Sequence, residues 1–370
     1  MTQRTASATP SRYGSTTVFA GVATPDAKAR PLYSRWRSCL AALGALFLSA
    51  CAADGSMVQG RPKPDWSLAD MPSQEGRIFL VTGGTSGIGY ESAKALAAAG
   101  AQVLIAARNP AQGEEAIASI RQETPGAQVR FESLDLADLA SVHRLSERLS
   151  ATLPRLDGLI NNAGLMEPPE RGTSADGFEM QFAVNYLGHF ALTGQLLPLL
   201  QKADAPRVVT LSSIAAARGG AAINFPDLQF EHAYDPAAAY GQSKLACLMF
   251  ALELQRRSDA AGWGLRSIAS HPGVSRTNLL ANRGGVSGFV RRNLSFLFQP
   301  AARGALPTLY AATAQDAQGG AYYGPTGMME ARGPLGFAKV PPAAADTRAA
   351  AQLWVVSEEL SGTRFPSPVR

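Results

Sequence analysis

Cysteine and histidine, the residues that most often bind metal ions, are scarce in this sequence. The 370 residues include only three cysteines and four histidines, and none of them is paired at the spacing of a zinc site or a disulfide framework. They are scattered along the chain: Cys39, Cys51, Cys247, His143, His189, His232 and His271. We therefore expect no metal site and no disulfide scaffold.

An excess of one charge is also lacking in most of the chain. The formal net charge is +5, but residues 1–64 contain eight Lys or Arg and two Asp or Glu, which leaves 26 basic and 27 acidic residues in the remaining 306. A nucleic-acid-binding domain carries its basic residues on the folded part. This distribution argues against a nucleic-acid partner, while 46% hydrophobic residues allow a sizeable core.

No hydrophobic run reaches the length of an ordinary transmembrane helix, which needs about 20 residues. The apolar stretch at residues 39–53 follows Arg35 and Arg37 and has the form of a signal-peptide core. Its end, Leu48-Ser49-Ala50-Cys51, resembles a bacterial lipobox. If so, Cys51 is lipidated and anchors the protein to a membrane.

Two interpretations of this leader stay open. A lipobox normally lies close to the first residue, whereas Met1 is fifty residues upstream of Cys51, and short apolar matches also arise by chance. Translation from near Leu32 would give a signal of ordinary length, and a start at Met57 or Met71 would give no leader. The expected location is therefore cytoplasmic or membrane-associated, the latter as a lipoprotein.

Short apolar segments alternate with helical segments from Arg77 onward, a pattern typical of βαβ units and a parallel sheet. Strands are expected at residues 78–81, 102–107, 129–133, 156–160, 207–211 and 265–270, and a last helix at 343–360. We therefore expect an α/β fold, a Rossmann-type doubly wound parallel sheet in a single domain at residues 74–345. A leader at 1–73 would precede it, and a C-terminal helix and tail at 346–370 would follow.

A glycine-rich turn follows the first expected strand directly. Gly83, Gly87 and Gly89 stand in it, with Ser86 and Ile88 among them, and a helical segment follows. Glycine lets backbone amides approach a pyrophosphate, and a helix N-terminus adds partial positive charge. An isolated glycine cluster is often merely a turn, but this position between strand and helix predicts a dinucleotide site.

The end of the second expected strand bears on the choice of cofactor. In dinucleotide folds this position faces the adenosine ribose, where an acidic residue favours NAD and an arginine favours the 2′-phosphate of NADP. The sequence there is Ala107-Arg108-Asn109, without a carboxylate. We therefore expect NADP(H) rather than NAD(H). The alternative is that Arg108 is only a solvated neighbour of a helix cap.

Tyr240 and Lys244 stand four residues apart in a helical segment. Residues at this spacing share one helix face, so the ammonium group can lie beside the phenol and favour its ionised form. The pair is therefore a candidate proton-transfer device.

An ordered set of motifs resembles the short-chain dehydrogenase/reductase family in its single-domain type, over residues 76 to about 280. These motifs are Thr82-Gly83 to Gly89, Asp135-Leu136, Asn161-Asn162-Ala163-Gly164, Asn185, Ser213, Tyr240 to Lys244, and Pro272-Gly273. An extra segment at 222–228, together with residues 184–190 and 240–246, resembles the retinol dehydrogenase and WW-domain oxidoreductase branch. The likeness implies a small apolar alcohol, aldehyde or ketone as substrate.

The resemblance also implies a role for each motif. In the catalytic set, Tyr240 would move the proton during hydride transfer, Ser213 would bind the carbonyl oxygen, Lys244 would also bind the nicotinamide ribose, and Asn185 would hold a water. Ser212 is the alternative to Ser213. The residues expected to bind the cofactor are Gly83, Ser86, Gly87, Ile88, Gly89, Arg108, Asp135, Leu136, Asn162, Ala163, Gly164, Tyr240, Lys244, Pro272, Gly273, Val274 and Thr277.

Structural alternatives exist for the single motifs. Asp135 could cap a helix, Asn161 and Asn162 could end a strand, and Pro272-Gly273 could form an ordinary turn. Taken together and in order, the motifs favour the family. His271 is assigned to structure.

Substrate specificity is expected in residues 281–345, with candidate lining residues Phe289, Phe296, Leu297, Phe298, Tyr322 and Tyr323. The alternative is that these side chains belong to the ordinary core, which is more common for aromatic residues at such spacing. Two other functions are compatible with the fold: a nicotinamide-binding regulator without chemistry, and a structural envelope lipoprotein. Both Tyr240 and Lys244 are present, which favours the enzyme.

Overall fold

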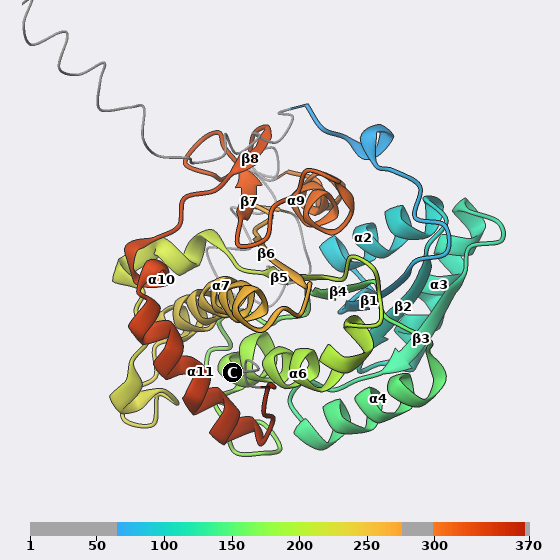
Figure 1. Cartoon of the computed structure of the whole chain (residues 1–370). Helices are drawn as coiled ribbons and strands as arrows, with labels where there is room; N and C mark the ends of the chain where they lie inside the picture. Colours follow the sequence, from blue (N-terminus) through green and yellow to red (C-terminus); the bar gives the residue numbers. More distant parts are fainter. Residues whose placement is uncertain (1–64, 276–298, 367–370) are drawn as a thin grey trace, which may run out of the picture. The chain divides into compact units, whose positions relative to one another are not determined.

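The computed structural model describes residues 65–275 and 299–366 (Figure 1). Several predictions fall outside these ranges. They concern the leader with Cys51, the cofactor contact at Thr277, and the candidate pocket residues Phe289, Phe296, Leu297 and Phe298.

The described part is built around one sheet with the strand order β3-β2-β1-β4-β5-β6-β7-β8. The strands through β7 run parallel, and β8 is antiparallel to β7. Their bounds are β1 Ile78–Thr82, β2 Gln102–Ala107, β3 Val129–Ser133, β4 Gly158–Asn161, β5 Arg207–Leu211, β6 Arg266–Ser270, β7 Tyr322–Pro325 and β8 Leu335–Phe337. The chain winds outward from β1 to β3 and then returns to place β4 beside β1. This reversal confirms the predicted Rossmann-type doubly wound fold.

Helices cover both faces of the sheet (Figure 1). They are α2 Gly87–Ala98, α3 Pro110–Glu123, α4 Leu139–Thr152, α5 Met180–Phe182, α6 Gly188–Leu200, α7 Pro236–Ala261, α9 Ala301–Thr313, α10 Pro342–Ala345 and α11 Thr347–Ser361. Shorter turns are the 3-10 helices η1 Leu68–Asp70, η3 Ile214–Gly220 and η4 Phe225–Asp227, and the π-helical turn η2 Ala183–Leu187.

Alternation along β1 divides the core in two. Ile78 and Leu80 pack into the core formed with α4, α6, α7 and α11, whereas Phe79 and Val81 pack into the core with α2, α3 and α9. All five residues of β1 are buried. A strand covered on both faces requires a continuous apolar run, which explains the short apolar segments of the sequence.

The C-terminal segment is part of the core on the α6 and α7 side. The expected helix at residues 343–360 is split into α10 and α11, because Asp346 starts α11 by accepting hydrogen bonds from the amides of Arg348 and Ala349. Trp354 of α11 packs between Phe250 and Phe365, with ring centroids 5.8 Å and 4.5 Å away. The segment thereby fixes α7, which carries Tyr240 and Lys244.

The short strands β7 and β8 were not predicted. Tyr322 and Tyr323 belong to β7 and are buried in the sheet, with 4% and 0% of their surfaces exposed, so they do not line the cleft described below. Their candidate place in a substrate pocket is therefore wrong, and the alternative that they are ordinary core residues is confirmed for both.

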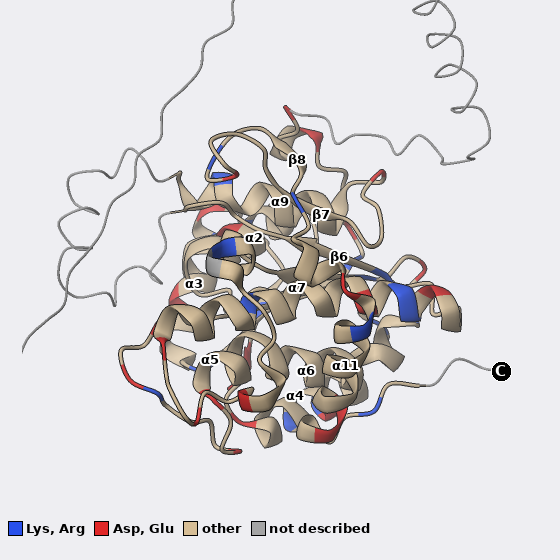
Figure 2. Ribbon diagram, turned by 90° about the vertical axis from the view of Figure 1, so that its left-hand side faces the viewer, with Lys and Arg blue, Asp and Glu red and all other residues tan. Residues whose placement is uncertain are grey.

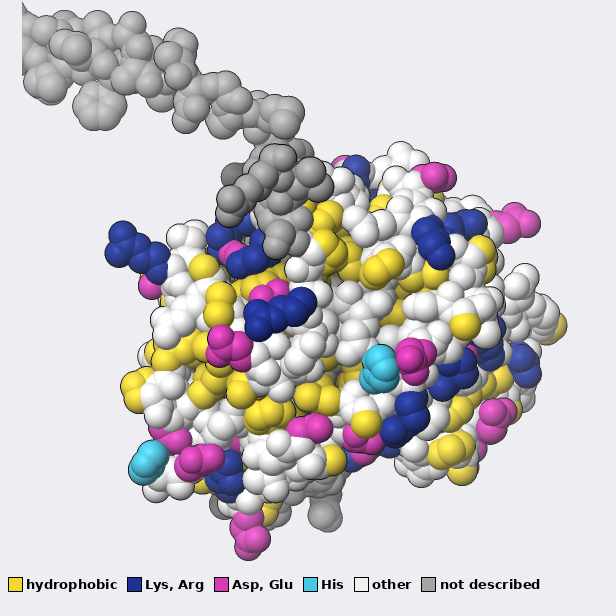
Figure 3. All heavy atoms as spheres, turned by 60° about the horizontal axis from the view of Figure 1, so that its bottom comes forward, with side chains coloured by type: hydrophobic (Ala, Val, Ile, Leu, Met, Phe, Trp, Pro, Cys, Tyr) yellow, Lys and Arg dark blue, Asp and Glu magenta, His cyan; other side chains and the backbone are white. Residues whose placement is uncertain are grey.

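Charged residues lie mainly in the loops and helices around the sheet (Figure 2). On the face in Figure 3, basic and acidic groups are interspersed with apolar ones, and neither sign dominates. Within residues 65–275 and 299–366, no helix has the length and apolar character needed to cross a membrane.

Candidate active site

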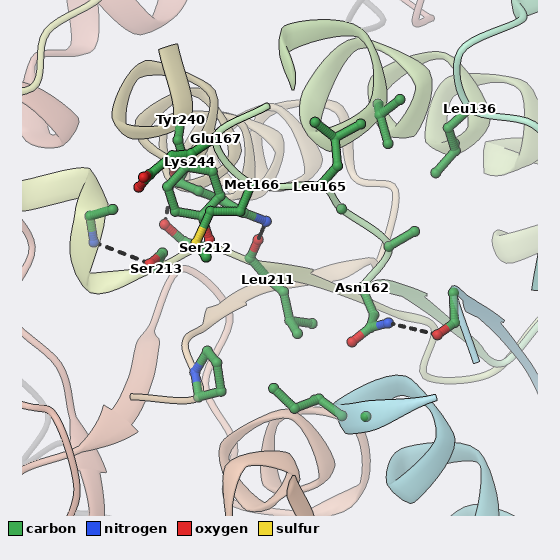
Figure 4. A pocket seen from close by; sticks show the side chains of 18 of the residues that line it. Leu136, Asn162, Leu165, Met166, Glu167, Leu211, Ser212, Ser213, Tyr240 and Lys244 are labelled. Carbon is green, nitrogen blue, oxygen red and sulfur yellow. Dashed lines mark hydrogen bonds between the residues drawn. The ribbon is translucent and has the colours of Figure 1, made fainter. Parts of the chain in front are cut away.

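A cleft of about 1790 Å³ lies at the carboxyl ends of the strands, where the winding of the sheet reverses. Every predicted site residue within the described ranges lines it except Asn185. These residues are Gly83, Ser86, Gly87, Ile88, Gly89, Arg108, Asp135, Leu136, Asn162, Ala163, Gly164, Ser213, Tyr240, Lys244, Pro272, Gly273 and Val274. In Figure 4, Asn162 lies at one end of the drawn cleft, and Ser213, Tyr240 and Lys244 cluster at the other.

The glycine turn between β1 and α2 has a backbone that other residues would strain. Gly83 and Gly87 have φ angles of +65° and +58°, in the left-handed region. A Cβ on Gly89 would overlap the carbonyl oxygen of Gly83 and the side-chain amide of Asn162. Helix α2 therefore starts directly against the end of β1. Because Ser86 gives this helix no side-chain cap, its first amides face the cleft without one.

Hydrogen bonds from Thr82 tie the end of β1 to the end of β4. Its hydroxyl oxygen accepts from the amides of Asn162 and Ala163 at 2.9 Å and 3.0 Å, and its carbonyl accepts from Asn162 Nδ2 at 2.8 Å. The preceding residue, Asn161, points the other way and donates to buried Thr193 at 3.1 Å. Two neighbouring strand ends are thus held as one wall of the cleft.

Arg108 stands exposed at the tip of β2, immediately before Asn109, which caps α3. The structure gives the guanidinium no hydrogen bond or ion pair with any described residue. Asp135 accepts a hydrogen bond from the amide of Ala137 at 2.9 Å, while the cap of α4 is Asp138. The alternative that Asp135 caps this helix is therefore wrong, and its carboxylate lies on the cleft wall instead.

Tyr240 and Lys244 both point from α7 toward the cleft (Figure 4). The Lys244 ammonium donates to the carbonyl of Leu211 at 3.1 Å, which holds it beneath the end of β5. The Ser213 hydroxyl oxygen accepts from the amide of Ala215 at 3.1 Å, so its own hydrogen is left to donate. The Ser212 hydroxyl donates to the carbonyl of Lys244 at 2.7 Å and is buried. Ser213 is thus the serine whose hydroxyl is available to a ligand.

Asn185 lies behind the cleft wall rather than on it. Its Oδ1 accepts from the amide of Leu165 at 2.8 Å, and its Nδ2 donates to the carbonyl of Leu165 at 3.0 Å and to Ser243 Oγ at 2.9 Å. Ser243 in turn donates to the carbonyl of Tyr240 at 2.8 Å. Gly164 separates Asn185 from Lys244: a Cβ there would lie 3.0 Å from Oδ1 and 3.5 Å from the ammonium nitrogen. Asn185 therefore supports the turn that carries Tyr240.

Sequence reasoning missed several polar groups under the site. Thr82, Ser243 and His189 lie within the quoted motifs, but they were assigned no role from the sequence, and no local pattern indicates the buried hydrogen bonds that they make. Burial lowers the pKa of His189 to about 4 and raises the pKa of the nearby thiol of Cys247. Both groups are therefore neutral near pH 7, as is usual for a buried group that forms no ion pair.

His271 is fully buried beside the loop that begins at Pro272. Its Nδ1 accepts from the amide of Gly273 at 3.2 Å, and its Nε2 lies 3.3 Å from a carboxylate oxygen of Glu330. The buried position of His271 agrees with the structural role that the sequence predicts for it. In the described part of the chain, no group of three or more His, Cys, Asp or Glu residues could hold a metal ion.

Comparison with known proteins gives a consistent picture. A family model described as short chain dehydrogenase matches residues 77–285. Mouse (Mus musculus) polyprenol dehydrogenase is 39% identical over 309 residues, covering 82% of this chain and 89% of its own length. Mouse retinol dehydrogenase 12 is 40% identical over 292 residues, covering 78% and 88%.

Solved structures agree with these sequence relatives. The crystal structure of an uncharacterised protein from Mycobacterium paratuberculosis is 41% identical, with a TM-score of 0.68, covering 81% of this chain and 99% of that one. A short chain dehydrogenase from Escherichia coli CFT073, complexed with NADPH, is 27% identical, with a TM-score of 0.55, covering 70% and 98%.

Proposed function

Because this chain belongs to the short-chain dehydrogenase/reductase family, we propose that it is an NADP(H)-dependent enzyme that oxidises an apolar alcohol or reduces the matching carbonyl compound. Membership makes it an oxidoreductase of the retinol dehydrogenase-like branch that acts on CH–OH or C=O groups with NAD(P). The observation that carries the proposal is the meeting of Ser213, Tyr240 and Lys244 in one cleft with the glycine turn.

The cleft wall fits a dinucleotide. The glycine turn leaves no side chain where a diphosphate would approach, and the uncapped start of α2 offers amide donors and partial positive charge. Arg108, exposed and without a partner among the described residues, is suited to the 2′-phosphate of NADP. By the family resemblance, the adenine would lie next to Asp135 and Leu136. The nicotinamide end of the cofactor would contact the segment that begins at Pro272, with Gly273, Val274 and Thr277. When bound, the cofactor supplies or accepts the hydride.

The chain's own residues would handle the proton. Tyr240 would exchange it with the substrate oxygen, and the Ser213 hydrogen, left available by the bond from Ala215, would stabilise the charge that develops there. Lys244 uses one of its three hydrogens on Leu211, which leaves two for the cofactor ribose and the phenol. Asn185 would hold the helical turn that carries Tyr240 and Lys244 in a fixed position, through its hydrogen bonds with Leu165 and Ser243.

An apolar substrate fits the lining of the cleft outside the proposed cofactor residues. This lining includes polar Asn224 and Gln242 together with many small and apolar side chains: Met166, Val184, Ile214, Ala215, Ala221, Ala222, Phe230, Ala237 and Ala238. Charged Glu167, Arg218 and Asp235 also line the cleft, and Arg218 and Asp235 are exposed. The names of the two mouse relatives refer to retinol and polyprenol, which are apolar alcohols. We therefore favour an alcohol or aldehyde on a hydrocarbon chain.

A screen of the purified full chain tests this function. Oxidation of NADPH and of NADH is followed with short and long aldehydes and ketones, and reduction of NADP and NAD with the corresponding alcohols. We expect turnover with NADPH that is faster for long apolar aldehydes than for short polar ones, and its loss in Tyr240→Phe with NADPH binding intact. Normal turnover by Tyr240→Phe would refute the assignment. Tight NADPH binding without turnover of any compound would favour the regulator instead.

Membrane attachment through Cys51 is a separate proposal that rests on the leader sequence. Mass spectrometry of the mature protein from cells should find a lipidated N-terminal Cys51. An unlipidated chain that starts at or after Met57 would overturn this proposal and leave the enzyme assignment untouched.

A further inference from the structure

His189 is a buried imidazole that bridges the two halves of the cleft wall. It is the second residue of α6 and 1% exposed. Its Nε2 lies 2.8 Å from the hydroxyl of Thr82, at the end of β1, and its Nδ1 lies 2.9 Å from the carbonyl oxygen of Asn185, in the π-helical turn. The histidine thus contacts one residue that holds the cofactor wall and one that holds the catalytic helix.

The hydrogen-bond partners determine which nitrogen carries the proton. The Asn185 carbonyl can only accept, so Nδ1 is the protonated nitrogen. In the neutral ring Nε2 is then an acceptor, and the Thr82 hydroxyl donates to it at 2.8 Å, while the Ile160 carbonyl oxygen is a second, longer acceptor of the same hydrogen at 3.3 Å. The two lone pairs of that hydroxyl receive the amides of Asn162 and Ala163. The Asn185 carbonyl also accepts from the thiol of Cys247 at 3.1 Å, so the shorter bond from His189 is the nearer of its two side-chain donors.

A protonated ring would disrupt this arrangement. Its Nε2–H would face a hydroxyl oxygen that already accepts two amide hydrogens. Burial lowers the pKa of His189 to about 4, and the charge of Lys244 acts in the same direction, while the bond to Asn185 opposes both. The neutral Nδ1–H form is therefore the one present near pH 7.

Each end of the bridge leads to a different part of the site. Through Thr82 it reaches the amides of Asn162 and Ala163, next to the glycine turn. Through Asn185 it reaches Ser243 and then the carbonyl of Tyr240. The π-helical turn that contains Asn185 is a form often found at functional sites. A shift at either end would therefore be passed to the other.

We propose that His189 is a positioning residue that couples the cofactor wall to the catalytic helix, by holding the Thr82 hydroxyl and the Asn185 carbonyl at fixed separation. The proposal rests on the proposed function, because it concerns alignment for hydride transfer. It assigns His189 no contact with substrate or cofactor.

Two substitutions separate the ends of the bridge. In His189→Asn the amide nitrogen takes the place of Nδ1 and keeps the bond to Asn185, but the side chain is too short for Thr82. In His189→Gln the amide oxygen takes the place of Nε2 and keeps an acceptor for Thr82, but the donor to Asn185 is lost. We expect His189→Asn to raise the NADPH Kd roughly tenfold with a smaller loss of kcat. For His189→Gln we expect kcat to fall roughly tenfold with a smaller change in Kd.

A matched control removes a buried helical hydrogen bond that is not part of this network. Ser146 of α4 is 3% exposed and donates to the carbonyl of Val142 at 2.9 Å. Ser146→Ala should lower Tm by an amount comparable to the histidine variants and leave Kd and kcat unchanged. The coupling is overturned if His189→Asn and His189→Gln lose only Tm, as the control does, or if both show the same ratio of Kd change to kcat change.

NADPH binding is measured by fluorescence titration without substrate, so the outcome does not depend on the proposed reaction. If the wild-type chain binds NADPH but converts no compound, the proposed function fails. The NADPH Kd of the variants still tests whether the bond between His189 and Thr82 positions the cofactor wall. An unchanged Kd in His189→Asn overturns the proposal, and a raised Kd supports it. A wild-type chain that binds no nicotinamide would overturn both.

Discussion

Alanine at Gly89 should destabilise the protein, although the same change in an ordinary helix would stabilise it. Replacing a glycine inside an exposed helix by alanine gains about 1 kcal/mol. Here the new Cβ would overlap the Gly83 carbonyl oxygen and Asn162 Nδ2, which donates to the carbonyl of Thr82 at 2.8 Å. Losing that bond costs about 1 kcal/mol, and overpacking costs about 1–3 kcal/mol. After the helical gain is subtracted, we expect a net loss of about 1–3 kcal/mol.

The same substitution should weaken cofactor binding. To relieve the overlap, the start of α2 must move away from β1, and with it the amides that are proposed to bind the diphosphate. We expect the NADPH Kd to rise at least about tenfold, which corresponds to about 1.4 kcal/mol. Urea unfolding gives the change in stability, and fluorescence titration of NADPH gives the change in affinity.

Gly126→Ala is the control for the Gly89 variant. Gly126 has a φ of +84°, and a Cβ there would have no neighbour within 4 Å, so the cost is backbone strain of about 1–2 kcal/mol. This variant should lose a similar amount of stability and bind NADPH as the wild type does. A Gly89→Ala protein as stable as the wild type, with unchanged NADPH affinity, would refute the close approach of α2 to β1.

Three further predictions concern the cofactor, the buried histidine and the C-terminal helix. Arg108→Ala should raise the NADPH Kd roughly 10- to 100-fold and leave NADH binding unchanged, because the proposed interaction of the arginine with the 2′-phosphate would be lost; titrations with both cofactors check this. The pKa of His189 is about 4 in the folded state and about 6.5 in the unfolded state, so acid protonates the unfolded chain first. The free energy of unfolding should therefore be unaffected by this group above pH 6.5 and fall by up to about 3 kcal/mol toward pH 4. Urea unfolding should show this loss in the wild type and not in His189→Asn. Trp354→Ala should cost about 3–5 kcal/mol in thermal or urea unfolding, since the ring is 2% exposed within the aromatic cluster under α11.

Local signals in the sequence account for much of the fold and the cleft. The glycine turn could be predicted because the positive φ angles of Gly83 and Gly87 require glycine, and the Tyr240–Lys244 spacing because a helix fixes it. Apolar runs revealed the central strands, since both faces of the sheet are covered. In β7 and β8 the strands have only four and three residues, too few for such a signal.

The coupling network could not be predicted from local patterns. Thr82 and His189 are 107 residues apart in sequence, and their hydrogen bond depends on how α6 packs under β1. Nothing in the sequence around His189 distinguishes a bridging histidine from one that only fills space. The same holds for Asn185, whose position behind the wall follows from its bonds to Leu165 and Ser243 rather than from its motif.

Two doublets at strand ends show how backbone geometry divides neighbouring polar residues between core and cleft. Successive side chains of an extended segment point to opposite faces. At the end of β4, Asn161 therefore bonds to buried Thr193, while Asn162 faces the cleft. At the end of β5, Ser212 bonds to the Lys244 carbonyl, and the Ser213 hydroxyl is left available. In each doublet the first residue anchors the strand end to a helix, and that anchoring sets where the second can meet a ligand. The proposal that Ser213 rather than Ser212 meets the ligand, which the sequence supported only through family resemblance, is thus also supported by strand alternation.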